Sequence, residues 1–408
     1  MEETIVAIDV GTTKICTLVA EVTPVRELRI VGIGVAPSRG LRKGVVVDIE
    51  ESTQAIAVSV AKAEQISGYH IDSAYVGISG AHISSLNSRG IAAVSRGERG
   101  IVQEDVNRAM EAARAVAIPH NRELIHAIPR GYVVDGQDGV RNPIGLRAFR
   151  LEVEAHVITG ASASIHNLLR CVQGAGVRVL DLVVQPIAAG EAVLTKPEKE
   201  LGVVLLDIGG GTTDMAVFID GSVWHTVVLA VGGNHLTHDV AVGLRTPFTV
   251  AETLKVKYGQ TMLDTIGEEE SIDATAFGDN VHRSVSRRRL VEIIRIRSEE
   301  ILELILRDIK RSGYDGLLPA GAVLCGGTAE LAGIKEFTRE ILGLPVRVGT
   351  PKHLEGLVDT ANNPAYACSV GLLLCGLSNS SEAAGDASSH RRGALSRLRQ
   401  WLNALTPG

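Results

Sequence analysis

Apolar runs of strand length occur throughout this 408-residue chain, and two of them end in almost the same way. One leads into Asp9 and a short turn of glycine and threonine, and the other leads into Asp207 and a longer glycine turn. A further apolar run follows each turn. This order predicts a strand, a tight turn and a strand, formed twice. The runs that flank the turns are residues 4–8, 15–19, 203–206 and 215–219.

Apolar stripes at helical spacing alternate with further short apolar runs, which predicts an α/β protein. The expected helices are residues 50–67, 103–116, 165–174 and 289–312. The expected strands are residues 75–78, 150–157, 179–184 and 322–325. Residues 85–160, with one helix and alternating strands, are predicted to form a separate insert.

Composition excludes several classes of function. The net charge of −6 argues against general nucleic-acid binding. The five cysteines are odd in number, lie in apolar surroundings and form no Cys-x-x-Cys motif, so we expect buried free thiols and no metal site of their own. We also expect no signal peptide and no membrane span, because the first residues lack the necessary pattern and apolar runs of about 18 residues do not occur.

Both turns have the chemistry of a phosphate-binding loop. Glycines let backbone amides approach an anion, and threonine hydroxyls add donors. An aspartate at the end of each first strand can hold a hydrated Mg²⁺. A third glycine turn, Gly326-Gly327-Thr328, follows the strand expected at residues 322–325. One such turn is common in any protein, but three in this order indicate two facing turns around a nucleotide.

The ordered set of turns resembles the actin, sugar-kinase and heat-shock-chaperone superfamily. This resemblance implies a two-lobed actin-like (ribonuclease-H-type) fold that binds ATP with Mg²⁺. It implies that both turns contact the phosphates from opposite sides, and that Asp9 and Asp207 orient Mg²⁺ through water. The implied phosphate-binding residues are Gly11, Thr12, Thr13, Lys14, Gly209, Gly210, Gly211, Thr212 and Thr213.

The same resemblance implies where the rest of the nucleotide lies. Gly326 and Gly327 would flank the nucleoside. The residues implied for the ribose and adenine side are Gly232, Gly233, Asn234, Glu252 and Lys255. Glu252 and Lys255 stand three positions apart, which is equally typical of a solvated ion pair on a helix surface.

Hydrolysis of ATP needs a group that positions water. Gln185 and Glu191 are the candidates by analogy with the superfamily, although Gln185 could equally be an ordinary strand-end residue before Pro186. No strong base is evident in the sequence, so we expect at most a slow ATPase whose function is mainly structural.

Several further motifs resemble the FtsA family of bacterial cell-division proteins. They lie in the N-terminal block around residues 38–48, in the insert at residues 133–143 and 150–160, and at residues 184–190. The resemblance covers nearly the whole chain. It implies an ATP-binding protein that tethers FtsZ filaments to the cytoplasmic face of the inner membrane at the division site. It also implies polymerisation on the membrane and recruitment of later division proteins through the insert.

The end of the chain differs in kind from the rest. Residues 378–390 are rich in serine, alanine and glycine and are predicted to be a flexible linker. Residues 391–408 are predicted to form an amphipathic helix that binds anionic lipids. Its apolar face is Leu395, Leu398, Trp401, Leu402 and Leu405, and its basic residues are Arg391, Arg392, Arg397 and Arg399. The alternatives are a packed terminal helix or a helix that binds a protein partner.

A basic cluster precedes and enters the helix expected at residues 289–312. Such a cluster is usually a solvated surface. In the FtsA family the corresponding subdomain receives the acidic C-terminal tail of FtsZ, which makes Arg283 and Arg297 the implied contacts.

The resemblance also implies how the chain divides into domains. The first lobe would comprise residues 1–84, 161–195 and 331–377, and the second lobe residues 196–330 with an outer subdomain at about 235–300. Two alternatives for the function remain open. One is another actin-like scaffold, for pilus assembly or cell shape, and the other is an ATP-dependent small-molecule kinase.

Overall fold

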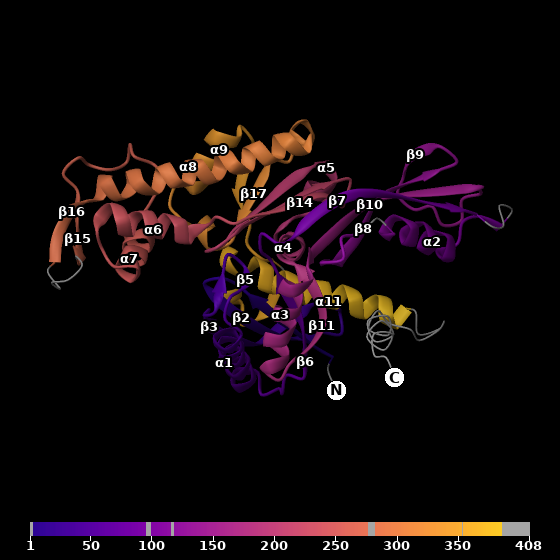
Figure 1. The fold of residues 1–408 in the computed structure, drawn as a ribbon, viewed down its shortest axis with the longest axis horizontal. Coiled ribbons are helices and arrows are strands. Elements are labelled where there is room, and N and C mark those ends of the chain that lie inside the picture. Colours follow the sequence, from indigo (N-terminus) through magenta and orange to yellow (C-terminus); the bar gives the residue numbers. More distant parts are fainter. Residues whose placement is uncertain (1–2, 95–98, 116–117, 276–281, 353, 386–408) are drawn as a thin grey trace.

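The computed structural model describes residues 3–94, 99–115, 118–275, 282–352 and 354–385. These residues form two α/β lobes and an elongated insert that extends from the junction of the lobes (Figure 1). Within the described ranges, no helix combines the length and the apolar character needed to cross a membrane.

The first lobe contains a six-stranded sheet in the order β11-β6-β1-β2-β3-β19. Helices α1 and α3 cover one face, and α4 and α11 pack on the other. The strands are β1 (Thr4–Val10), β2 (Lys14–Val22), β3 (Leu28–Pro37), β6 (Ser73–Ile78), β11 (Arg178–Val184) and β19 (Leu354–Gly356). The helices are α1 (Ile49–Ser67), α3 (Ser162–Gly174), α4 (Gln185–Val193) and α11 (Ala367–Gly385).

The second lobe contains a five-stranded sheet in the order β14-β13-β12-β17-β18. Its strands are β12 (Val203–Ile208), β13 (Thr213–Ile219), β14 (Ser222–Leu229), β17 (Ala322–Cys325) and β18 (Val346–Val348). Its helices are α5 (Lys196–Leu201), α6 (Gly233–Leu244), α7 (Phe248–Tyr258), α8 (Arg287–Ser312) and α9 (Ile334–Leu342). A small hairpin of β15 (Ser271–Thr275) and β16 (His282–Ser286) precedes α8.

The central strands of both lobes are buried on both faces. In β1, Val6 and Ile8 face the core beneath α1, while Ile5 and Ala7 face the core around α4 and α11. In β12 the alternate residues divide in the same way between the outer core and the core between the lobes. This explains why these strands appear in the sequence as continuous apolar runs.

The insert has its own sheet, in the order β7-β10-β8-β9, with one helix on one face. Its elements are β7 (Ser84–Ala93), α2 (Gln103–Arg114), β8 (Arg122–Val134), β9 (Gln137–Val140) and β10 (Arg150–Ala161). Val106 and Met110 of α2 pack against Leu151 and Val153 of β10 in a separate core. Further short elements among the described residues are β4 (Leu41–Arg42), β5 (Val45–Val46), α10 (Val358–Ala361) and the 3-10 turns Asp315–Leu317, Gly327–Glu330 and Pro364–Tyr366.

The predicted helices and strands are confirmed to within a few residues at their ends. Local capping residues fix both ends of the first predicted helix, α1. Asp48 caps its first turn by accepting from Glu51 N at 3.0 Å, and Gly68 ends it with φ of 74°. The linker predicted at residues 378–390 needs a correction, because α11 continues to Gly385. The helix predicted at residues 391–408 lies outside the described residues.

Candidate functional site

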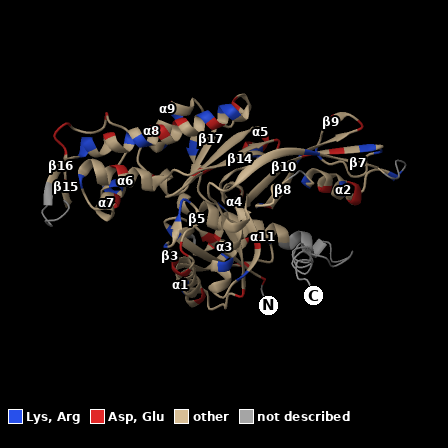
Figure 2. Ribbon diagram, viewed as in Figure 1, with Lys and Arg blue, Asp and Glu red and all other residues tan. Residues whose placement is uncertain are grey.

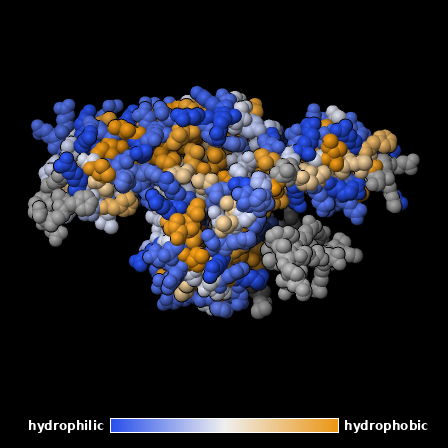
Figure 3. Space-filling view, in the orientation of Figure 1, coloured by the Kyte–Doolittle hydropathy of each residue, from blue (hydrophilic) through white to orange (hydrophobic). Residues whose placement is uncertain are grey.

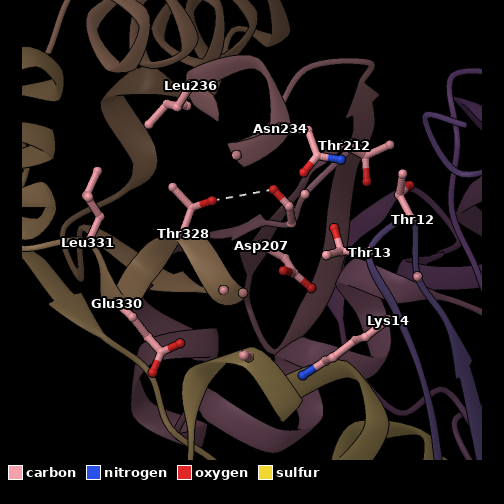
Figure 4. Close-up of a pocket in the computed structure, with 18 of the residues that line it drawn as sticks. Thr12, Thr13, Lys14, Asp207, Thr212, Asn234, Leu236, Thr328, Glu330 and Leu331 are labelled. Carbon is pink, nitrogen blue, oxygen red and sulfur yellow. Dashed lines mark hydrogen bonds between the residues drawn. The ribbon is translucent and has the colours of Figure 1, made fainter. Parts of the chain in front are cut away.

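A cavity of about 640 Å³ opens between the two lobes. Figure 4 shows Thr12, Thr13, Thr212 and Asn234 near one another on one side of it, and Glu330 and Leu331 on the other side. A volume in this range is typical of sites for small ligands and cofactors. The predicted residues that line it are Asp9, Gly11, Thr12, Thr13, Lys14, Asp207, Gly209, Gly210, Gly211, Thr212, Gly233, Asn234, Glu252, Lys255, Gly326 and Gly327.

The two predicted turns are four-residue hairpin loops of the same design. Gly11 N donates to Lys14 O at 3.1 Å in the first, and Gly209 N donates to Thr212 O at 2.9 Å in the second. The two loops pack directly against each other at the edge of the cavity. A Cβ added to Gly210 would lie 1.8 Å from Thr13 Oγ1, and one added to Gly211 would lie 2.5 Å from Thr12 Oγ1. The glycines of the second loop therefore leave room for the threonines of the first.

Three buried carboxylates meet at the floor of the cavity. Asp9 accepts from Gln185 Nε2 at 2.9 Å and from Ser369 Oγ at 3.0 Å. Burial raises the pKa of Asp9 and raises the pKa of Asp207 well above its usual value, with Asp214 and Asp9 adding to the effect on Asp207. Burial also raises the pKa of Asp214 to about 6. The site therefore concentrates negative charge that a cation would stabilise.

The arrangement fits Mg²⁺ held through water. Among the described residues, His, Cys, Asp and Glu do not form a group of three or more that could hold a metal ion directly. The carboxylates of Asp9 and Asp207 are oxygen donors of the kind that hydrated Mg²⁺ accepts, and both line the cavity.

Lys14 supplies positive charge to the same floor. Its Nζ lies 3.3 Å from the centre of the Tyr366 ring, on the 3-10 turn Pro364–Tyr366, an arrangement that favours a cation. Burial lowers the pKa of Lys14, and the carboxylates of Asp9 and Asp207 oppose this shift.

The start of α6 forms the side of the cavity that the sequence predicted to face a nucleoside. Gly233 N donates to Gly209 O at 2.9 Å and Asn234 N donates to Gly210 O at 2.8 Å, which ties this helix to the second loop. Thr328 Oγ1 also donates to Gly209 O at 3.4 Å, the bond drawn in Figure 4. The third glycine turn and α6 therefore both donate a hydrogen bond to the carbonyl of Gly209, the first residue of the second loop.

Glu252 and Lys255 lie on the cavity wall formed by α7. Lys255 Nζ is 2.8 Å from Glu252 Oε2 and donates to Thr237 Oγ1 at 2.9 Å. The Lys255 side chain is only 14% exposed, so this pair differs from an ordinary solvated pair on a helix surface.

Three predicted residues do not line the cavity. Thr213 is fully buried and donates to Val231 O at 2.8 Å. Gly232 packs against the carbonyls of the second loop, where a Cβ would lie 2.5 Å from Gly209 O. Glu191 sits further along α4 and pairs with Lys199 at 2.8 Å. Of the two residues suggested for positioning water, only Gln185 lines the cavity.

Several residues that line the cavity were missed from the sequence, chiefly Ser79, Asp214, Thr328 and Glu330. Asp214 could have been found from the sequence, because it directly follows the second predicted turn at the start of a strand. Ser79 could not have been found in this way, because only the fold brings it to Asp214, 135 positions away.

The residues predicted to bind partners lie outside the cavity. Arg297 projects from α8, and its guanidinium contacts Asp239 and Glu300, each at 2.5 Å. Figure 2 shows basic and acidic residues interspersed along this helix. Arg283 lies on β16, where it pairs with Ala274 of β15.

Comparison with known proteins decides the family. A family model described as Cell division protein FtsA matches residues 204–371, and one described as SHS2 domain inserted in FTSA matches residues 80–159. Cell division protein FtsA of Pseudomonas aeruginosa is 43% identical over 406 residues, covering 98% of this chain and 97% of that protein. The chain belongs to the FtsA family. The FtsA proteins of Neisseria meningitidis and Escherichia coli are 41% and 35% identical, each over at least 97% of both chains.

Solved structures agree on the fold that FtsA-family membership implies. The PilM-PilN type IV pilus biogenesis complex aligns with a TM-score of 0.67 at 17% identity, over 91% of this chain and 98% of that chain. MreB5 of Spiroplasma citri bound to ADP aligns with a TM-score of 0.57 at 13% identity, over 94% and 99%. The predicted actin-like fold with a family-specific insert is therefore confirmed, and the role in cell division follows from the family.

Proposed function

We propose that this FtsA-family protein binds ATP with Mg²⁺ between its lobes and tethers FtsZ filaments to the cytoplasmic face of the inner membrane at the division site. The observation that carries the proposal is the pair of complementary loops around one cavity, with buried carboxylates at its floor. The related MreB5 structures are bound to ADP and to AMPPNP, which supports a nucleotide as the ligand.

Different residues of the cavity bind the phosphates and the Mg²⁺ ion. Backbone amides of the glycine loops and the hydroxyls of Thr12 and Thr13 donate to phosphate oxygens, and Lys14 adds positive charge. Asp9 and Asp207 hold the hydration shell of Mg²⁺, whose charge offsets the phosphates and these carboxylates. Gln185 carries a neutral amide, which can orient water but is a poor base, so hydrolysis is slow.

Membrane attachment is assigned to residues 391–408. Four arginines near an anionic surface contribute on the order of 1 kcal/mol each. Partial burial of five apolar side chains adds about 1 kcal/mol each, and ordering the segment costs several kcal/mol. One copy therefore binds weakly and reversibly. A polymer of many copies binds stably, because linked anchors act together.

Docking of the acidic FtsZ tail is assigned to Arg283 of β16 and Arg297 of α8. An acidic tail has to compete with Asp239 and Glu300 for the guanidinium of Arg297. We expect charge reversal of both residues, Arg283→Glu with Arg297→Glu, to weaken FtsZ binding. Normal FtsZ binding by the double variant would remove this docking site.

Recruitment of other division proteins is assigned to the insert. Its far end exposes a patch of Val102, Ile144, Leu146 and Phe149, the last of them 80% exposed. Figure 3 shows apolar side chains reaching the surface at this end of the molecule. Exposed apolar groups gathered in one place are typical of a protein-binding surface.

Sedimentation with liposomes tests the central proposal. The full chain and a variant lacking residues 391–408 are mixed with anionic or neutral vesicles, with and without ATP and Mg²⁺. We expect pelleting and filaments only for the full chain on anionic vesicles with ATP. A matched variant in which Arg391, Arg392, Arg397 and Arg399 become glutamine separates the charge from the apolar face. Pelleting of the truncated chain would contradict membrane attachment through this segment.

A further inference from the structure

The residue that precedes the insert contacts the nucleotide cavity directly. Ser79 follows β6 and stands immediately before residues 80–159, the stretch matched as the inserted domain. Its side chain lines the cavity and is almost fully buried. Its Oγ donates to Asp214 Oδ1 at 2.5 Å and lies 3.5 Å from Thr212 Oγ1. A hydroxyl of the first lobe is thus bound to the second phosphate loop and its following strand.

The next residue, Gly80, is linked to the first phosphate loop through Gly44. Gly80 adopts φ of 135° and packs on Gly44 so closely that a Cβ on Gly44 would lie 2.8 Å from Gly80 Cα. Gly44 N donates in turn to Thr12 Oγ1 at 3.0 Å. The two residues at the root of the insert therefore touch both loops, one directly and one through Gly44.

One arginine joins the two ends of the insert at this root. Arg122 Nη2 donates to His82 O at 2.9 Å and to Ser84 Oγ at 2.5 Å, where the insert begins. The same side chain donates to Thr159 O at 2.9 Å and to Thr159 Oγ1 at 3.0 Å, where the insert ends. A shift of residues 79–82 therefore moves both connections together.

The body of the insert also rests on the second lobe. His156 Nε2 lies 3.0 Å from Thr226 Oγ1, and Ser85 Oγ donates to Thr226 O at 2.8 Å. The guanidinium of Arg130 lies 4.0 Å from the centre of the Trp224 ring. Thr226 and Trp224 belong to β14, which pairs with the strand that carries Asp214. The insert is thus joined covalently to one lobe and by polar contacts to the other.

We propose that Ser79 is a positioning residue that couples occupancy of the phosphate site to the orientation of the insert. The coupling rests on the proposed function, in that ATP is the ligand of this cavity. A ligand that moves the second loop moves Asp214, and Ser79 transmits the movement to the root joined by Arg122. Because linkage is reciprocal, a partner bound to the insert changes the affinity for ATP by the factor by which ATP changes the affinity for that partner.

Hydrogen–deuterium exchange on the full chain tests this coupling. Exchange is followed in β7, β10 and α2, with and without AMPPNP and Mg²⁺, using α1 as an internal reference. In the unchanged chain we expect the nucleotide to alter exchange in the insert by about fivefold, the lower end of usual coupling. In Ser79→Ala we expect this response to fall below about twofold. Ser79→Thr keeps the hydroxyl and restores the response.

Ser88→Ala is the matched control, because it removes a hydroxyl from β7 that makes no hydrogen bond among the described residues. Its response equals that of the unchanged chain. Fluorescent-nucleotide titration of each variant separates the two proposals. If the unchanged chain binds no ATP, the proposed function fails. If it binds ATP and Ser79→Ala keeps the full response, or the insert never responds, only the coupling is overturned.

Discussion

The two glycine loops, which we propose bind phosphate, have the same backbone geometry and differ in their side chains. Both begin two residues after a buried aspartate, and both close with a hydrogen bond from the first glycine to the fourth residue. The first loop carries Thr12, Thr13 and Lys14, while the second carries Gly210 and Gly211 at the facing positions. The two therefore form a complementary pair, in which side chains of one occupy space left by the other.

The difference extends into the strands behind the loops. Strand register places Cys16 opposite Asp9 in the first hairpin and Asp214 opposite Asp207 in the second. The first hairpin therefore sets a thiol opposite its aspartate, and the second sets a second carboxylate opposite its aspartate. Two hairpins with the same backbone geometry can therefore place different numbers of carboxylates at the cavity.

The largest effect is expected from making the first hairpin resemble the second. Cys16 is fully buried, and Cys16→Asp would place an unpartnered carboxylate beside Asp9. We expect a loss of about 3–5 kcal/mol in the free energy of unfolding, measured by urea denaturation. Cys16→Ala is the control for lost volume. A difference below about 1 kcal/mol between the two variants would contradict the charge argument.

The second effect tests the fit between the loops. Gly210→Ala should cost about 1–3 kcal/mol, because its Cβ would overlap Thr13 Oγ1. Adding Thr13→Ala removes that oxygen and should recover most of the stability. Gly209→Ala is the matched control, since its Cβ would meet nothing closer than 3.4 Å. If the double variant is no more stable than Gly210→Ala, the loops do not fit as described.

The third effect separates the two aspartates. Asp207→Asn removes a carboxylate that repels Asp9 and Asp214. The free energy of unfolding of the ligand-free protein should therefore rise by about 1 kcal/mol. Asp9→Asn should gain less, because Asp9 already accepts from Gln185 and Ser369. Both variants should weaken Mg²⁺–ATP binding by about tenfold or more. Equal stability changes in thermal unfolding would show that the two sites are equivalent.

The smallest effect is a pH dependence that belongs to the second hairpin. The pKa of Asp214 is raised to about 6 in the folded protein, above its value in the unfolded chain. The protonated form is therefore favoured by folding, and stability is lost as pH rises through 6. Without nucleotide or Mg²⁺, we expect unfolding to need about 1 kcal/mol less at pH 7 than at pH 5.

Two variants check the origin of this pH dependence. Asp214→Asn should make the profile shallower, because it removes one titrating group and keeps an acceptor for Ser79. Asp273→Asn, on the exposed side of β15, should leave the profile unchanged. An unchanged slope in Asp214→Asn would assign the titration to another group.

Local chemistry explains which site residues the sequence revealed. Gly209, Gly210 and Gly211 follow an apolar run and precede another, so their loop is encoded within a few positions. Gln185 and Glu191 were candidates by analogy with the superfamily. The structure places Gln185 in the lining of the cavity, whereas Glu191 lies outside the lining and pairs with Lys199. The linker prediction was wrong for residues 378–385, because small polar residues can extend a helix that packing has already begun.

By itself the sequence determined the doubled hairpins, the third glycine turn, the separate pattern of the insert and the resemblance to one family, since each of these is written in neighbouring residues. Only the tertiary structure decided that Lys14 and Thr212 hold equivalent positions, that Asp214 joins the carboxylate floor and that Ser79 reaches the second loop. Those facts depend on strand register and on the approach of two lobes, which no local pattern encodes.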